Sequence, residues 1–447
     1  MYLFLFSKIW YIIAINVTLI IGKELFTIEI IELSPNVTLR CFRDTRFKQG
    51  CLSFQLVGQM TAEDAAWRAL LPSVLLRGTR KCPDLRSITQ RLDTLYGASV
   101  SPLVRRVGDC QTTGLYCSLM DDRFALPGDR VLEPMTEFLG ELLLDSPVEQ
   151  EGFLPAFVES EKSNLISTIE CELNDKRLYA QNRLLEKMCA PDSFGLPRLG
   201  RPEQIRTIDP IALRRNYLEA LQTNPVQIFY VGSASQEEVA RLLAPVVRGL
   251  SQKSVPVPPQ SGLKTEEPGE LTEEMDVTQG KLCMGFTTPI TNRTEEFAAM
   301  QVLNVLFGGG MTSKLFQNVR EKLSLCYSIG SVYYSVKGVV TVSAGIDFDR
   351  KDCVREEILH QLEQCRQGHI SEPELTAARE ALCSSLRATH DSPGSIEGYY
   401  ATAALSGLEM TPEQYIRAVE AVKKEQVVRC ARQLELHTTY FLRGESR

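Results

Sequence analysis

The feature that most constrains the fold of this chain is an internal repeat. In a sequence of 447 residues, the segment LLPSVLLRGT at residues 70–79 aligns with QVLNVLFGGG at residues 301–310, an offset of 231 positions. The same offset pairs Tyr96 with Tyr327, outside the two segments. A repeat of this length indicates a duplicated domain, so each half of the chain is expected to carry the same fold.

The order of the expected elements favours α+β domains. Strand-like runs alternate with helical segments, but without the regular strand–helix–strand order that builds a parallel sheet. We therefore predict two homologous domains, each a mainly antiparallel sheet with helices packed on one face. The predicted parts are an apolar N-terminal extension at 1–25, a first domain at 26–250, an exposed Pro-, Ser- and Glu-rich linker at 251–274 and a second domain at 275–447.

Two predicted helices of the first domain bear on its function. The sequence TAED at residues 61–64 opens a helix that runs toward Leu76. Pro72 is expected to interrupt this helix, because an interior proline removes a backbone donor and costs roughly 3 kcal/mol. A second, longer helix is predicted from Phe153 to Met188.

The second domain contains a stretch with several unusual features, at residues 302–331. An apolar helix leads into three consecutive glycines, and an amphipathic helix follows with Thr312 or Ser313 as its N-cap. Arg320 falls beside the buried stripe of that helix, and Tyr327 falls just past its end. Each feature alone is compatible with a turn, a solvated charge or a core residue, whereas their combination is more specific. The three glycines are Gly308, Gly309 and Gly310.

The order GGG, S-x-L-F, V-R-E-K-L and L-x-Y-S resembles the second half of the pitrilysin/insulinase-type metallopeptidases, the inverzincins. The resemblance covers roughly residues 26–447 and implies the same two-domain fold. In that family, the residues that match Arg320 and Tyr327 hold the substrate at a zinc site built by a different domain. The resemblance also implies that the backbone of the glycine run approaches a bound extended peptide.

The zinc-binding part of the family pattern is absent. An inverzincin carries H-x-x-E-H on the first helix, just before a Gly-Thr pair, so that two imidazoles bind Zn²⁺ and the glutamate activates water. The matching segment here runs from Ala69 to Ser73, with Pro72 in the position of the glutamate. The first histidine of the chain is His360, so no realignment restores the motif. We predict that this chain binds no zinc and is not active alone.

The third zinc ligand of the family is a glutamate on the long helix of the first domain. The alignment places Thr168 at that position, and Glu170 is the alternative match. One carboxylate without imidazoles does not make a tight zinc site. The metal is therefore expected only in a partner.

Within the family, the chain is most similar to the inactive YmfF-type branch, whose relatives are encoded with an H-x-x-E-H-bearing YmfH-type protein and are associated with modification of elongation factor P. The resemblance implies a non-catalytic, substrate-holding subunit of a heterodimeric zinc peptidase that acts on a peptide or unfolded protein. One alternative is a structural or peptide-binding protein without a proteolytic partner, and another is a lone enzyme with different chemistry. The segments that carry the similarity are ALLPSVLLRGTRKCP at 69–83, NDKRLYAQNR at 174–183 and DSPGSIEGYY at 391–400.

The amino-acid composition limits which classes of molecule the protein can bind and in which cellular compartment it is expected. The chain has 49 basic and 56 acidic residues, a net charge of -7, which argues against a nucleic-acid binder. Thirteen cysteines without a C-x-x-C pair indicate reduced thiols and a cytoplasmic protein. The apolar run at residues 1–22 is either an anchor or signal, or an appended or wrongly assigned start. Because Lys8 and Asn16 interrupt it and no cleavage site follows, no membrane association is expected.

Overall fold

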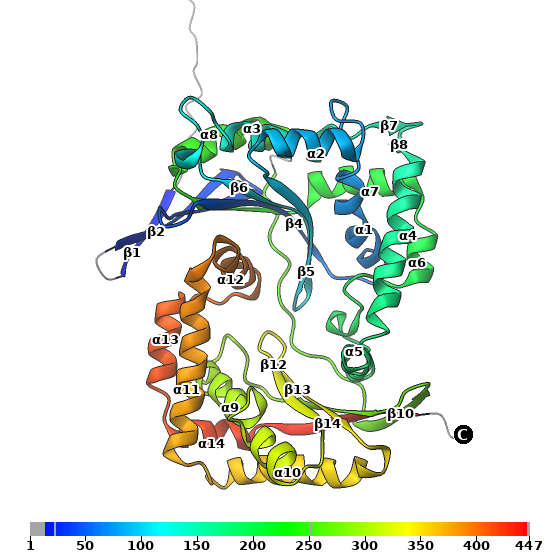
Figure 1. Cartoon of the computed structure of the whole chain (residues 1–447), viewed down its shortest axis with the longest axis vertical. Helices are drawn as coiled ribbons and strands as arrows, with labels where there is room; N and C mark the ends of the chain where they lie inside the picture. Colours follow the sequence, from blue (N-terminus) through cyan, green and yellow to red (C-terminus); the bar gives the residue numbers. More distant parts are fainter. Residues whose placement is uncertain (1–13, 22–23, 251–252, 445–447) are drawn as a thin grey trace, which may run out of the picture.

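The structure, a computed structural model, describes residues 14–21, 24–250 and 253–444, and it contains two large sheets (Figure 1). The first sheet has seven strands in the order β1-β2-β3-β9-β4-β6-β5. All neighbouring pairs are antiparallel except β3 with β9. Its strands are β1 (Ala14–Ile21), β2 (Glu24–Ser34), β3 (Val37–Arg43), β4 (Gln49–Gln59), β5 (Ser99–Val107), β6 (Cys110–Met120) and β9 (Val226–Gly232).

The second sheet repeats this topology without counterparts of β1 and β2, the two strands at one edge of the first sheet. Its order is β10-β14-β11-β13-β12, and β10 with β14 is again the parallel pair. β10, β14, β11, β13 and β12 therefore take the places of β3, β9, β4, β6 and β5. Together with the sequence repeat, this shared order confirms the predicted α+β class with two homologous halves. The strands are β10 (Gly269–Met275), β11 (Gly280–Thr287), β12 (Ser328–Tyr334), β13 (Val339–Ile346) and β14 (Glu435–Gly444).

Helices from each half cover one face of its own sheet, as predicted, and enclose one large apolar core in each half. A short hairpin, β7 (Val148–Glu149) with β8 (Gly152–Phe153), precedes the longest helix of the first half. The helices of the first half are α1 (Ala65–Leu75), α2 (Leu85–Thr94), α3 (Leu132–Leu144), α4 (Pro155–Glu172), α5 (Lys176–Met188), α6 (Pro202–Arg206), α7 (Pro210–Thr223) and α8 (Gln236–Arg248). Those of the second half are α9 (Phe297–Gly308), α10 (Lys351–Arg366), α11 (Glu372–Arg387), α12 (Pro393–Ser406), α13 (Pro412–Glu420) and α14 (Lys424–Arg432).

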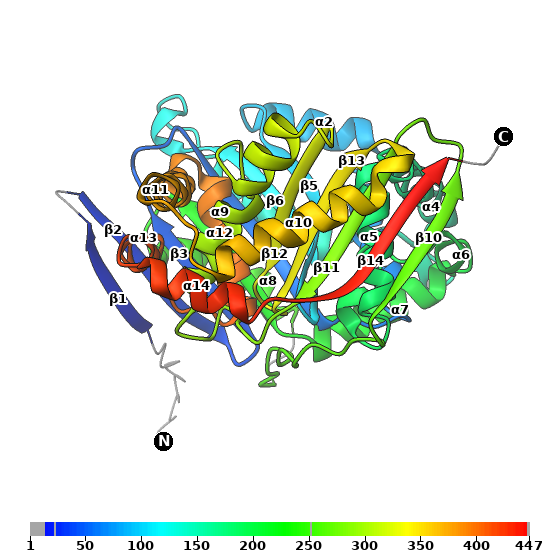
Figure 2. The same cartoon turned by 90° about the horizontal axis from the view of Figure 1, so that it is seen from below.

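The opposite face of each sheet is covered by a helix from the other half. α12 of the second half packs beneath the first sheet, where Ile396 and Ala401 are buried against β3, β4 and β9 (Figure 1). In return, α5 of the first half packs on the second sheet, where Ala180 and Leu184 are buried against β11 and β14 (Figure 2). This reciprocal exchange buries an apolar cluster around each of the two helices at the interface between the halves.

Three of the differences from the expected elements concern where elements begin, end or break. The predicted helix from Phe153 to Met188 is broken into α4 and α5, because the Asp175 side chain caps a new helix by accepting from the backbone N–H groups of Arg177 and Leu178. The end of the apolar extension, Ala14–Ile21, pairs with β2 as an edge strand. Of the segment predicted as linker, residues 253–268 have no helix or strand, and β10 begins at Gly269.

Candidate functional site

The residues that the family resemblance singles out in the second half line one open cleft of about 360 Å³. Tyr327 directly precedes β12, and Asp347 directly follows the neighbouring strand β13. All lining residues come from the second half, so this cleft is complete without any group from the first half. They are Arg320, Glu321, Ser324, Leu325, Cys326, Tyr327, Asp347 and Arg350.

The helix that carries Arg320 is a π-helix, η3 (Leu315–Lys322), rather than the expected α-helix. Its hydrogen bonds reach five residues back, as in the 3.0 Å bond from the Leu323 N–H to the Asn318 carbonyl. Because this winding shifts each residue around the axis, Leu323 is 44% exposed instead of lying on the buried stripe. Ser313 does act as the cap, since its hydroxyl accepts from the Phe316 N–H. π-turns are frequent at functional sites.

Arg320 presents a guanidinium group to the cleft. Its guanidinium carbon lies 4.6 Å from the centre of the Phe316 ring, which fixes the side chain by a cation–π contact. Its charged neighbour Glu321 is 3.6 Å away, an ion pair between two exposed side chains that contributes little. The planar fork of donors is therefore available to a carbonyl or carboxylate group.

Tyr327 belongs to a hydrogen-bonded group with two residues that the sequence did not single out. Its hydroxyl donates to Asp347 Oδ1 at 2.9 Å, and Asp347 also pairs with Arg350 at 3.3 Å. Arg350 in turn donates to the carbonyl of Ser324, whose φ of +49° lies in the left-handed region. The hydrogen bond to Asp347 raises the pKa of Tyr327, so the phenol stays protonated. The spacing gave no signal for Asp347 and Arg350, because they follow a strand that meets Tyr327 only in the folded sheet.

The glycine run does not line this cleft. Gly308 is the last residue of α9, and a Cβ at this position would lie 2.7 Å from Ser331 Oγ and 2.9 Å from the Ser331 backbone nitrogen in β12. Gly308 therefore permits close packing of α9 on the strand that follows Tyr327. Gly309 caps the helix with φ of −82°, and Gly310 has open space around its Cα.

The degenerate zinc helix is α1, and it passes through Pro72 without a break. Pro72 cannot donate to the carbonyl of Arg68, four residues earlier. The hydroxyl of Thr113 on β6 replaces that donor, at 2.6 Å from the Arg68 oxygen. Ala69 is 4% exposed, and Pro72 is also buried. A methyl group and a pyrrolidine ring thus fill the positions where the family places an imidazole and a general base, and these residues do not fit a zinc ion.

The carboxylate on α4 that reaches α1 is Glu161. It pairs with Arg77, just past the end of α1, at 3.2 Å. Thr168, the aligned distal position, is exposed and donates to the Asn164 carbonyl one turn earlier, and Glu170 pairs at 3.8 Å with Arg206. In the part of the chain that the structure describes, no three His, Cys, Asp or Glu side chains are grouped as metal ligands would be.

The Thr113–Arg68 contact predicts a double-mutant cycle. Thr113→Val should lower the free energy of unfolding by about 1–3 kcal/mol, because the buried Arg68 carbonyl loses its donor. In a Pro72→Ala background the same change should cost about 1 kcal/mol or less, because the new N–H at position 72 can donate to that carbonyl. Urea unfolding of the four proteins measures both differences, and equal costs in the two backgrounds would show that Thr113 does not substitute for the missing helix bond.

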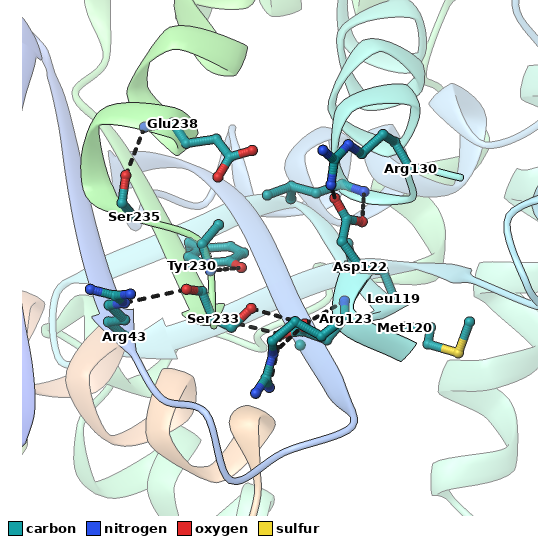
Figure 3. A pocket seen from close by; sticks show the side chains of 14 residues that line it. Arg43, Leu119, Met120, Asp122, Arg123, Arg130, Tyr230, Ser233, Ser235 and Glu238 are labelled. Atoms are coloured by element: carbon teal, nitrogen blue, oxygen red, sulfur yellow. Dashed lines mark hydrogen bonds and ion pairs between the residues drawn. The ribbon is translucent and has the colours of Figure 1, made fainter. Parts of the chain in front are cut away.

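A second cleft, of about 330 Å³, lies in the first half where β6 and β9 end (Figure 3). Its two aspartates are engaged within the protein: Asp121 accepts from the Ser233 hydroxyl at 2.9 Å and from Arg123, while Asp122 accepts from the backbone N–H groups of Val131 and Leu132 at the start of α3. These contacts hold the loops around the strand ends. We therefore assign a structural role to the residues of this second cleft. The cleft lined by Arg320 and Tyr327 remains the candidate site.

Comparisons with known proteins bear on the family of the chain. A family profile described as the peptidase M16 inactive domain matches residues 207–382. The probable inactive metalloprotease YmfF of Bacillus subtilis is 29% identical over 408 residues, which is 91% of this chain and 96% of that protein. The chain is therefore similar to the pitrilysin/insulinase-type, or M16, metallopeptidases, and residues 207–382 match the inactive domain of that family.

Solved structures show the same fold. A conserved protein from Enterococcus faecalis V583 superposes with a TM-score of 0.87 at 25% identity, over 94% of this chain and 99% of that one. A peptidase M16 inactive domain from Pseudomonas fluorescens superposes with a TM-score of 0.76 at 15% identity, over 94% and 98% of the two chains. Among the residues described, no helix is both long and apolar enough to cross a membrane.

Proposed function

We propose that this chain is the non-catalytic, peptide-holding subunit of a two-chain zinc peptidase, in which a homologous H-x-x-E-H-bearing subunit brings the metal. The observation that carries the proposal is the contrast between the two halves. Arg320 and Tyr327 line one open cleft, whereas the motif positions of α1 carry a buried methyl group at Ala69, a buried pyrrolidine ring at Pro72 and only a hydroxymethyl group at Ser73. In this proposal, the chain keeps the residues that bind the substrate, while the partner subunit supplies the zinc ion that cleaves it.

The cleft would hold a peptide through two kinds of donor. The Arg320 fork can bind a backbone carbonyl or a carboxylate of an extended peptide. Tyr327 is 59% exposed, so its ring is free to turn and transfer its single donor from Asp347 to a peptide carbonyl. Asp347 and Arg350 then act as positioning residues that return the phenol to the same place.

Location and pathway form part of the same proposal. All thirteen cysteines are free thiols, eleven of them buried, as expected for a protein in the reducing cytoplasm. The link to modification of elongation factor P rests on the resemblance to the YmfF-type branch.

The test is co-expression with an H-x-x-E-H homologue from the same genome, followed by cleavage of a fluorogenic peptide mixture. Arg320→Ala should lower kcat/KM by about 100-fold and Tyr327→Phe by about tenfold, because both donors position the scissile carbonyl. Arg215→Ala, which removes an exposed arginine on α7, is the matched control. Cleavage that is equally fast with all three variants would show that this chain does not hold the substrate.

A further inference from the structure

Equivalent hairpins of the two halves meet tip to tip at the centre of the molecule (Figure 1). The β5–β6 turn carries Gly108 and Asp109, and the β12–β13 turn carries Val336 and Lys337. Gly108 has φ of +56°, and a Cβ there would lie 2.6 Å from the Val336 side chain. The repeat has therefore diverged at this point, since one tip carries an acid and the other a base.

Lys337 is the centre of a buried ion cluster at this contact. Its side chain is 0% exposed, and its ammonium lies 2.7 Å from Asp109 and 3.0 Å from Asp192, whose side chains are 2% and 1% exposed. The carbonyl of Ser261 is a third acceptor at 3.3 Å. These acceptors satisfy all three donors of the ammonium group.

The connection between the halves is tied into the same cluster. The Ser261 hydroxyl donates to Asp109 at 2.8 Å, and the Lys264 N–H donates to Asp192 at 2.9 Å. Gln260 adds a brace, because its side chain accepts from the Asp109 N–H and donates at 3.0 Å to the Leu405 carbonyl in α12. A segment without helix or strand is thus held by side chains from both halves.

The charges in this cluster resist separation. Burial alone would raise the pKa of Asp109, but hydrogen bonds from Lys337, Ser193 and Ser261 outweigh burial and lower it, so this carboxylate stays charged at neutral pH. Moving the tips apart would separate the Lys337 ammonium from both of its carboxylate partners, Asp109 and Asp192. Removal of one partner from a buried ion group is strongly unfavourable, whereas the intact group is held by mutual attraction.

We propose that Lys337, Asp109, Asp192 and Ser261 form a lock that fixes the two halves in one arrangement. The reciprocal helices α5 and α12 supply apolar burial, and the lock supplies a defined contact at the hairpin tips. The two halves therefore move together as one rigid body. This inference is independent of the proposed function.

Amide hydrogen exchange on the full chain tests the lock. The Ser261 and Lys264 amides lie in an irregular segment, yet they should exchange at least about 100-fold more slowly than unstructured amides, because both donate to buried carboxylates. Lys337→Met should speed their exchange by at least about tenfold and raise the radius of gyration in X-ray scattering. Lys187→Met, which removes an exposed lysine on α5, should change neither quantity.

Two outcomes would overturn the lock. One is a wild-type chain in which the Ser261 and Lys264 amides exchange at unstructured rates while β6 remains protected. The other is a Lys337→Met variant whose exchange at these amides and radius of gyration both match those of wild type. If Lys337→Met fails to fold, the wild-type measurement and the variant Asp192→Asn still decide the question. Asp192→Asn leaves the Asp109–Lys337 pair in place. An unchanged exchange rate of the Lys264 amide in this variant would count against the lock.

Discussion

Glu397→Ala is expected to lower the free energy of unfolding by about 3–5 kcal/mol, because it removes the buried partner of a partly buried ion pair together with the acceptor of two buried side-chain donors. Glu397 lies on α12 and is 0% exposed. Its two carboxylate oxygens accept from Arg105 at 2.9 and 2.7 Å, and one of them also accepts from Ser53 and Gln55 at 2.8 Å. Alanine would leave a guanidinium, a hydroxyl and an amide without their acceptor.

Urea unfolding of wild type, Glu397→Ala and Glu397→Gln provides the measurement. Glutamine retains the shape and one acceptor, so it should fall between the other two proteins. Glu409→Ala, at an exposed glutamate just past α12, is the control and should lie within about 0.5 kcal/mol of wild type. A loss below about 1 kcal/mol in Glu397→Ala would mean that α12 does not depend on this contact.

The Glu397 contacts also show which part of the fold could not be predicted from the sequence. The strand-like runs were predictable because β-branched and aromatic residues are local signals, as in β3, where buried and half-buried side chains alternate in part, and in β4, which is buried along almost its whole length. The repeat predicted two copies of one fold. The placement of α12 under the opposite sheet had no such signal, since Arg105 and Glu397 are 292 positions apart in sequence.

At the candidate site, too, some residues could be predicted from the sequence and others could not. Arg320 and Tyr327 were predicted from the family pattern, and the structure brings them to one cleft. Asp347, which holds the Tyr327 hydroxyl, was not predicted because its contact depends on the pairing of β12 with β13. The π-winding of η3 was also missed, because its residues fit an amphipathic α-helix equally well.

Restoring the family's metal-binding motif by the triple change Ala69→His, Pro72→Glu and Ser73→His is expected to unfold the first half rather than create a zinc site. Imidazole does not fit in the space of the Ala69 methyl group, which is 4% exposed, and the buried Pro72 position would receive a carboxylate. Overpacking and a buried charge together should lower the free energy of unfolding by at least about 3 kcal/mol. Ser73→His alone, at a half-buried position, should be tolerated.

Metal analysis of the purified proteins, together with urea unfolding, measures both effects. Zinc content should remain far below one ion per chain in wild type and in the triple variant, because Glu161 is already paired with Arg77. Adding Arg77→Ala to the triple variant would free the Glu161 carboxylate. This variant distinguishes two reasons for a lack of zinc binding: a third ligand that is blocked by Arg77, and a site that is too small for the metal. One zinc per chain in the folded triple variant would contradict the argument, because it would mean that α1 has lost only its ligands and has kept the room for a metal.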